Sequence, residues 1–270
     1  MRGPFCLIGG KNRLADKIIA RFPEHLTYVE PFAGGAQVFF RKPPSKVEVL
    51  NDLNDEIVNF FRICQQHYQE LLRYTRFLLA SRSWFDSLQR CSPETLTDVQ
   101  RAARFLYLQK NAFAGMVVRR NYKAHVVNPP NFDPTRLPAM IKAVHDRLAR
   151  VQLECLPYQQ LLEKFDRAET FFYLDPPYYD KKLYRFNFTK ADFSELAARL
   201  KTLSGKFLLS LNDVPEVRKL FSEFNIEPIK LAYSAQKKAE IRYRELFITN
   251  YGRSLRRIRQ GCTIPNPLAE

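Results

Sequence analysis

The stretch of this 270-residue chain best suited to chemistry is an aspartate followed by two prolines and a tyrosine, Asp175 to Tyr178. It follows Thr170–Leu174, an apolar and aromatic run with the composition of a buried strand. The prolines end that strand, because neither can donate a hydrogen bond to a ladder and each fixes its own φ. The sequence therefore predicts a carboxylate on a rigid turn at the carboxyl end of a strand, where open α/β sheets bind ligands.

Such a turn can hold the amino group of a flat heterocycle. Asp175 and the carbonyl of Pro176 can each accept a hydrogen bond from an amine, and the ring of Tyr178 can stack on a planar base. The lone pair of the amine would then point at an electrophile. A Pro-Pro turn that only ends a strand explains the same four residues, so the choice depends on the rest of the chain.

A second set of elements, upstream, fits a nucleoside. Residues 28–41 predict a strand ending at Glu30, a turn at Gly34-Gly35 and a helix, and a further strand over 47–50 leads to Asp52. Glycines let the backbone approach a ligand, and an acid after the second strand suits a ribose hydroxyl. The turn lacks the glycine pattern of dinucleotide folds, so a nucleoside cofactor without a pyrophosphate fits better.

Gly9-Gly10-Lys11 predicts a tight loop that opens a helix. A lysine at a helix N-terminus opposes the helix dipole. Lys11 therefore serves either a ligand or the solvent, and the sequence leaves both interpretations open.

The chain is strongly basic, with 43 Lys and Arg against 28 Asp and Glu and a net charge of +15. A polyanion such as nucleic acid is the simplest partner for that balance, although a basic enzyme of another kind would show it too. The five cysteines and four histidines form no metal-ligand spacing, so we expect reduced thiols and no metal. We see no secretory signal or bilayer-length apolar run, and we expect a cytoplasmic protein without membrane contact.

The positive charge is concentrated in residues 101–150, which carry ten Lys and Arg against two Asp. Helical patterns over 54–90 and a helix beginning at Ser92-Pro93, with the serine as N-cap, precede a predicted hairpin within 110–123. Basic and polar residues interleaved with aromatic ones suit phosphates and base edges, so we favour nucleic-acid recognition over a solvated surface.

Alternating elements resume after residue 134. We expect helices at 137–148, around 161–162, at 189–203 and at 216–224, and strands at 151–155, 206–211, 226–233 and 245–251. A basic loop with Lys237, Lys238, Arg242 and Arg244 joins the last two strands. If the strands share one sheet, the glycine turn and the Asp-Pro-Pro-Tyr turn face the same crevice.

Five motifs, in this order, resemble those of the Dam-type family of adenine-specific DNA methyltransferases. They are Gly9–Lys11, Glu30–Gly35, Asn51–Asn54, Asp175–Tyr178 and Glu245–Tyr251. The similarity covers roughly residues 4–252. It implies an α/β, Rossmann-like fold that uses S-adenosylmethionine and carries a mainly helical target-recognition insert. The implied domains are a discontinuous catalytic domain of residues 1–60 and 151–252, an insert of residues 61–150, and a basic tail of residues 253–270.

The resemblance also implies roles for individual residues. A flipped adenine would be held for direct methyl transfer, without a metal, by Asp175, Pro176, Pro177 and Tyr178. The cofactor residues would be Lys11, Glu30, Phe32, Gly34, Asp52 and Asp175, with Asp52 on the ribose hydroxyls. The DNA contacts would come from Lys110, Asn111, Met116, Arg119, Arg120, Asn121 and Lys123.

The implied partner is double-stranded DNA, and a cognate restriction endonuclease is a candidate second partner. We expect a monomer in a bacterial or phage-infected cell. Leu7-Ile8 stand where the family has a tryptophan, and Ala114–Val118 lack the guanine-reading arginine of its Asn-Gly-Leu-x-Arg segment. The resemblance therefore does not imply GATC as the target. RNA or a protein glutamine amide also offers a planar amine, and a catalytically inactive DNA-binding relative is a further alternative.

Overall fold

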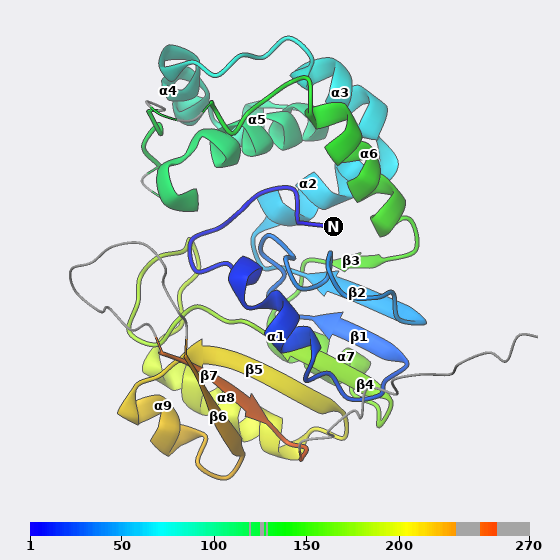
Figure 1. The fold of residues 1–270 in the computed structure, drawn as a ribbon, viewed down its shortest axis with the longest axis vertical. Coiled ribbons are helices and arrows are strands. Elements are labelled where there is room, and N and C mark those ends of the chain that lie inside the picture. Colours follow the sequence, from blue (N-terminus) through cyan, green and yellow to red (C-terminus); the bar gives the residue numbers. More distant parts are fainter. Residues whose placement is uncertain (119, 125–126, 128, 231–243, 253–270) are drawn as a thin grey trace, which may run out of the picture.

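The computed structural model describes residues 1–252 except 119, 125–126, 128 and 231–243. Helices cover both faces of a mixed β-sheet, and a group of further helices gathers on one side of it (Figure 1). The predicted α/β, Rossmann-like class is confirmed by this arrangement.

Within the described residues, the sheet has seven strands in the order β3-β2-β1-β4-β5-β7-β6. The strands are β1 (Thr27–Glu30), β2 (Val47–Asn51), β3 (Gln152–Glu154), β4 (Thr170–Leu174), β5 (Lys206–Asn212), β6 (Asn225–Lys230) and β7 (Arg244–Thr249). The first five strands of this order, from β3 through β2, β1 and β4 to β5, are parallel to their neighbours. Strand β7 is antiparallel to both β5 and β6. The strand order reverses between β1 and β4, so a ligand crevice is expected at their carboxyl ends.

The side chains of β4 alternate between two hydrophobic cores. Phe171 and Tyr173 join the core that includes α1 (Ala15–Ile19), while Phe172 and Leu174 join the core on the opposite face. That second face is covered by α7 (Tyr158–Phe165), α8 (Lys190–Thr202) and α9 (Pro215–Leu220). All five residues of β4 are therefore buried, which explains why the strand is an unbroken apolar run.

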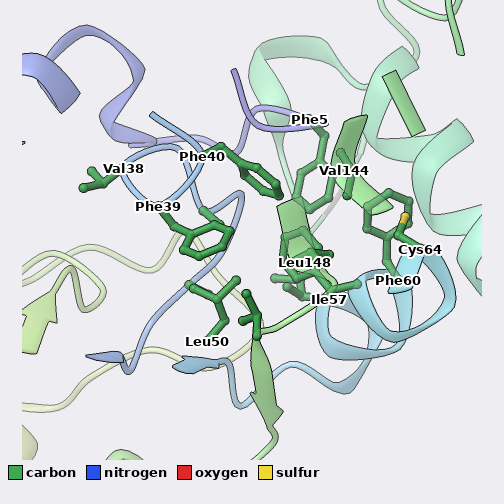
Figure 2. Packing of buried hydrophobic residues seen from close by; sticks show 14 of the residues in the cluster. Phe5, Val38, Phe39, Phe40, Leu50, Ile57, Phe60, Cys64, Val144 and Leu148 are labelled. Atoms are coloured by element: carbon green, nitrogen blue, oxygen red, sulfur yellow. The ribbon is translucent and has the colours of Figure 1, made fainter. Parts of the chain in front are cut away.

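The remaining helices form a layer that shares the first core with the sheet. They are α2 (Asp55–Gln66), α3 (Tyr68–Thr75), α4 (Arg82–Arg90), α5 (Asp98–Asn111) and α6 (Leu137–Leu148). Figure 2 shows Phe60 of α2 and Leu148 of α6 in one cluster with Leu50 of β2. The predicted domain boundary after residue 60 thus falls inside α2, and the division into domains stays a prediction. None of the described helices is both long enough and apolar enough to cross a bilayer.

The helix predicted after the glycine turn is wrong. This segment forms successive turns, in which Phe40 N–H donates to the Ala36 carbonyl (3.0 Å) and Lys42 N–H to the Val38 carbonyl (3.0 Å). Ala36 has a φ of +48°, which is incompatible with a continuous right-handed helix. Pro43 and Pro44 then prevent any extension, because neither has an N–H group.

The predicted N-cap at Ser92 is also wrong. Pro93–Thr95 form a single 3-10 turn, and the Ser92 side chain accepts no capping bond from its N–H groups. Helix α5 begins at Asp98, where Thr97 and Gln100 form a reciprocal capping box that satisfies two N–H groups of the first turn. The other predicted helices and strands are present with ends shifted by a few residues, while Lys237, Lys238, Arg242 and the tail 253–270 lie outside the described residues.

Candidate active site

The Asp-Pro-Pro-Tyr turn leaves the carboxyl end of β4 and is held by the neighbouring strand. Asn212, the last residue of β5, accepts a hydrogen bond from Tyr179 N–H (2.9 Å) and donates one to the Tyr179 carbonyl (3.3 Å). Ser210 of the same strand donates to Asp175 Oδ1 at 3.0 Å. The side chain of Asp175 remains 20% exposed, so it stays accessible from the crevice.

Lys11 lies buried beside this turn and contacts two carboxylates. Its Nζ lies 2.5 Å from Asp175 Oδ1 and 3.2 Å from Glu245 Oε1. Burial opposes the charge of the ammonium, but Asp175 and Glu245 outweigh it, and the pKa of Lys11 is raised well above its usual value. A permanent positive charge is therefore built in next to Asp175.

The phenol oxygen of Tyr178 is fixed from two sides. It accepts a hydrogen bond from Lys11 Nζ (3.2 Å) and donates one to Glu245 Oε2 (2.9 Å). Lys11 Nζ also lies 4.7 Å from the centroid of the Tyr178 ring. Burial raises the pKa of Tyr178, so the hydroxyl keeps its proton and remains a donor.

A cavity of about 900 Å³, counted to its open mouth, extends from Asp175 along the carboxyl ends of β1 and β2. Lys11, Glu30, Phe32, Gly34, Asp52 and Asp175, the six predicted cofactor residues, all line it. Sequence-distant segments complete the wall with Ile8, Val117, Tyr184 and Phe188. A concave, mainly apolar wall with a few convergent polar groups is typical of sites that bind a small organic ligand.

Glu30 and Asp52 face this cavity without an ion-pair partner in the described part of the chain. Tyr28 donates to Glu30 Oε2 at 2.8 Å, and burial raises the pKa of Glu30 to about 8. Asp52 accepts hydrogen bonds from Gly34 N–H and Asn54 N–H, both at 2.8 Å, and burial raises its pKa to about 6. Both acids would gain from a ligand that brings positive charge or hydroxyl donors.

Gly9 and Gly34 shape the cavity wall with backbones that favour glycine. Their φ angles are +75° and +50°. A Cβ at Gly9 would lie 2.6 Å from the Tyr184 hydroxyl, which donates to the Ile8 carbonyl at 2.7 Å. The contact between the N-terminal loop and the loop after the Asp-Pro-Pro-Tyr turn therefore favours glycine at position 9.

Residues 7–235 match the family described as D12 class N6 adenine-specific DNA methyltransferases. The chain belongs to this family. Its similar relatives include the type II methyltransferases M1.LlaDCHI of Lactococcus lactis subsp. cremoris, 26% identical, and M.MjaIII of Methanocaldococcus jannaschii, 25% identical. Each alignment covers 90% of this chain and 93% or 96% of the relative. The retron Ec67 DNA adenine methylase of Escherichia coli is 25% identical over 82% of this chain and 81% of its own length.

The chain is therefore a site-specific DNA adenine methyltransferase, and the resemblance drawn from its motifs is confirmed. The match to the family covers residues 7–235, which include the Asp-Pro-Pro-Tyr turn and the predicted hairpin. The positions of the predicted DNA-contacting residues come from the structure alone.

The predicted hairpin of the methyltransferase forms, but its side chains differ in exposure. Ala112 and Tyr122 make an antiparallel bridge, with Phe113 N–H donating to the Asn121 carbonyl at 2.8 Å. Asn121 is exposed, and Met116 and Lys123 are partly exposed. Arg119 lies outside the described residues.

Three of the predicted DNA-contacting residues are directed inward instead. Asn111 is fully buried and donates to the Tyr107 carbonyl at 2.9 Å. Lys110 is partly buried, and this burial lowers its pKa. Burial, with Arg104 nearby, lowers the pKa of Arg120 to about 10. In this conformation these three support the hairpin more than they face a duplex.

Sequence reasoning missed Glu245 and Ser210 as site residues of the methyltransferase. Glu245 is an acid near the start of an otherwise apolar strand, and Ser210 is the single hydroxyl in the run Phe207–Leu211. Both are almost completely buried, with 4% and 0% of their surface exposed. A polar residue inside an apolar strand is the signal that could have identified them, because buried polar groups need partners.

Proposed function

We propose that this enzyme transfers a methyl group from S-adenosylmethionine to the exocyclic amine of an adenine flipped out of duplex DNA. The observation that carries the proposal is the position of Asp175, which borders the same cavity as Glu30 and Asp52. One crevice thus offers a carboxylate for an amine and two carboxylates for a cationic nucleoside.

The cavity fits the proposed cofactor by its chemistry. S-adenosylmethionine supplies an electrophilic methyl group on a positively charged sulfur. In the proposal, Asp52 accepts hydrogen bonds from the ribose hydroxyls, Glu30 faces the ammonium group, and Phe32 contacts the adenine ring of the cofactor. Gly34 lets the backbone approach it. The two acids lack a cation of their own among the described residues, which supports a positively charged ligand.

The catalytic turn acts on the target base. Asp175 and the carbonyl of Pro176 accept hydrogen bonds from the adenine amine, which orients its lone pair toward the methyl group. Pro177 keeps the turn rigid, and Tyr178 stacks on the flipped ring. Lys11, whose Nζ lies 2.5 Å from Asp175 Oδ1, keeps this carboxylate ionised so that it can accept. We thus assign Lys11 to the catalytic turn as well as to the cavity wall.

The helical insert supplies the DNA contacts in this proposal. Residues 61–150 form the recognition insert, and residues 1–60 and 151–252 form the catalytic domain. The exposed Asn121 and the partly exposed Lys123 make the main contacts with DNA. Met116 and Arg119 complete the proposed contacts, while Lys110, Asn111 and Arg120 support the hairpin that presents them. We place the enzyme in the cytoplasm as a monomer, with a restriction endonuclease of the same target sequence as its functional counterpart.

The direct test is transfer of a labelled methyl group from S-adenosylmethionine to unmethylated duplex DNA, followed by mapping of the modified base. We expect N6-methyladenine in one short sequence context, which would also name the target. Single-stranded RNA and a glutamine-containing protein serve as parallel substrates. Methylation of either in preference to duplex DNA would overturn the proposed substrate, and cofactor binding without any transfer would favour an inactive DNA-binding relative.

A further inference from the structure

Glu245 reaches the catalytic turn because β7 is antiparallel to the other strands of the sheet. It pairs with Asn212, the last residue of β5, across an antiparallel ladder. The start of β7 therefore lies at the edge where the parallel strands end, which is the edge that carries the crevice. An acid near the beginning of this strand meets residues from the end of β4.

Two contacts join Glu245 to the base-binding residues. Its Oε2 accepts a hydrogen bond from the Tyr178 hydroxyl at 2.9 Å, and its Oε1 lies 3.2 Å from Lys11 Nζ. The side chain is only 5% exposed. A carboxylate buried to this extent is costly unless its partners are fixed, so the contact restrains the tyrosine as firmly as the acid.

We propose that Glu245 is a positioning residue of the adenine site, which holds the Tyr178 ring in the place where it receives the flipped base. The inference rests on the proposed role of Tyr178 as the stacking residue. The phenol oxygen is held between a donor, Lys11, and an acceptor, Glu245, so the ring cannot swing away about χ1 without losing a bond to one of them. Holding a ring in advance avoids ordering it when the base arrives.

A purely structural role for Glu245, as a counter-ion that allows Lys11 to be buried, predicts a different response to substitution. Loss of a counter-ion would harm the fold whether or not Tyr178 carries a hydroxyl. Loss of a positioning bond would matter only while that hydroxyl is present.

The experiment is a double-mutant cycle on methyl transfer to duplex DNA at saturating cofactor. In the wild-type background we expect Glu245→Ala to lower kcat about tenfold, as loss of a hydrogen bond to a charged group does, with cofactor Kd changed less than about twofold. In a Tyr178→Phe background the same substitution should lower kcat less than about twofold further. Glu245→Gln keeps an acceptor oxygen and should retain kcat within about threefold of wild type.

Glu245→Asp keeps the charge but withdraws the oxygens by one methylene, and it carries the same test if the alanine variant does not fold. We expect Glu245→Asp to lower kcat in the wild-type background and to leave it unchanged in the Tyr178→Phe background. Equal losses in both backgrounds, unchanged kcat, or a loss confined to cofactor affinity would overturn the positioning role. The wild-type rate on adenine is measured in the same series, and its absence would count against the proposed function itself.

Discussion

The crevice contains two pairs of carboxylates that differ in their ion pairing. Glu30 and Asp52, at the ends of β1 and β2, form no ion pair within the described residues, since Lys42, whose charge acts on Glu30, is paired with Glu48 at 2.5 Å. Asp175 and Glu245, at the end of β4 and the start of β7, share the buried Lys11. All four lie close to one edge of one sheet, so position alone does not explain the contrast.

In the proposed function, the difference in ion pairing follows from the ligand that each pair of carboxylates binds. An uncharged amine brings no positive charge, so an acid that must accept from it needs a cation from the protein to stay ionised. A cationic ligand brings its own charge, and an internal lysine would compete with it. In the proposed function, Asp175 and Glu245, which share Lys11, therefore serve the adenine site, and Glu30 and Asp52, which have no ion pair, serve S-adenosylmethionine.

Asp175→Ala should give the largest effect. It removes an acceptor for the target amine, so we expect kcat to fall by about 1000-fold or more, with DNA and cofactor affinities changed less than about threefold. Single-turnover methylation and separate binding titrations measure the two quantities. A variant that lost cofactor affinity while keeping kcat would erase the distinction between the two pairs.

Lys11→Met should rank second. It leaves Asp175 and Glu245 without their cation, and because burial already raises the pKa of Asp175, that pKa should rise further. A protonated Asp175 cannot accept on that oxygen, so we expect a loss of about 100-fold near neutral pH that lessens as the pH increases. The pH profile of kcat is the measurement. Lys17→Met, on the exposed side of α1, is the matched control and should retain activity.

Asp52→Asn should affect the other pair. The amide offers the ribose hydroxyls one acceptor oxygen instead of two, so we expect cofactor Kd to increase about tenfold, with kcat at saturation within about threefold of wild type. Calorimetric titration with the cofactor gives Kd directly. Asp86→Asn, at an exposed position of α4, controls for the loss of one negative charge. A fall in kcat with unchanged Kd would assign Asp52 to the chemical step instead.

Glu30→Gln should give the smallest effect, on stability rather than on turnover. Burial raises the pKa of Glu30 from 4.5 to about 8, so the folded, ligand-free protein holds a proton that the unfolded chain has released between these values. Stability therefore falls as the pH rises through that window, and the neutral glutamine escapes the loss. We expect Tm of the variant to exceed the wild-type Tm by a few degrees at about pH 9 and to equal it at about pH 4.

Thermal melts without cofactor at both pH values test this expectation. Tyr28, Asp175, Lys42 and Asp52 surround position 30 in both proteins, but the glutamine does not ionise, so only the wild-type protein should show the pH-dependent loss. The same difference in Tm at both pH values would mean that the glutamine acts through packing.

The sequence by itself determined the crevice and its first set of residues. Apolar runs that stop at Glu30, Asp52 and Asp175 mark the ends of parallel strands, and such ends meet at one edge. Prolines, glycines and strand composition are local signals, which is why the turn after β4 and most elements were predictable. The helix after Gly35 was not, because Ala36 takes a positive φ for which the sequence gives no indication.

Tertiary structure alone decided which charges meet. Lys11 lies 164 positions before Asp175, and no periodicity connects them. Glu245 comes to the crevice only because β7 is antiparallel, and the burial of Asn111, the last residue of α5, and of Arg120 appears only in the folded chain. Ion pairing and burial depend on contacts between distant segments. The folded chain therefore decides that two of the four carboxylates share Lys11 and the other two form no ion pair.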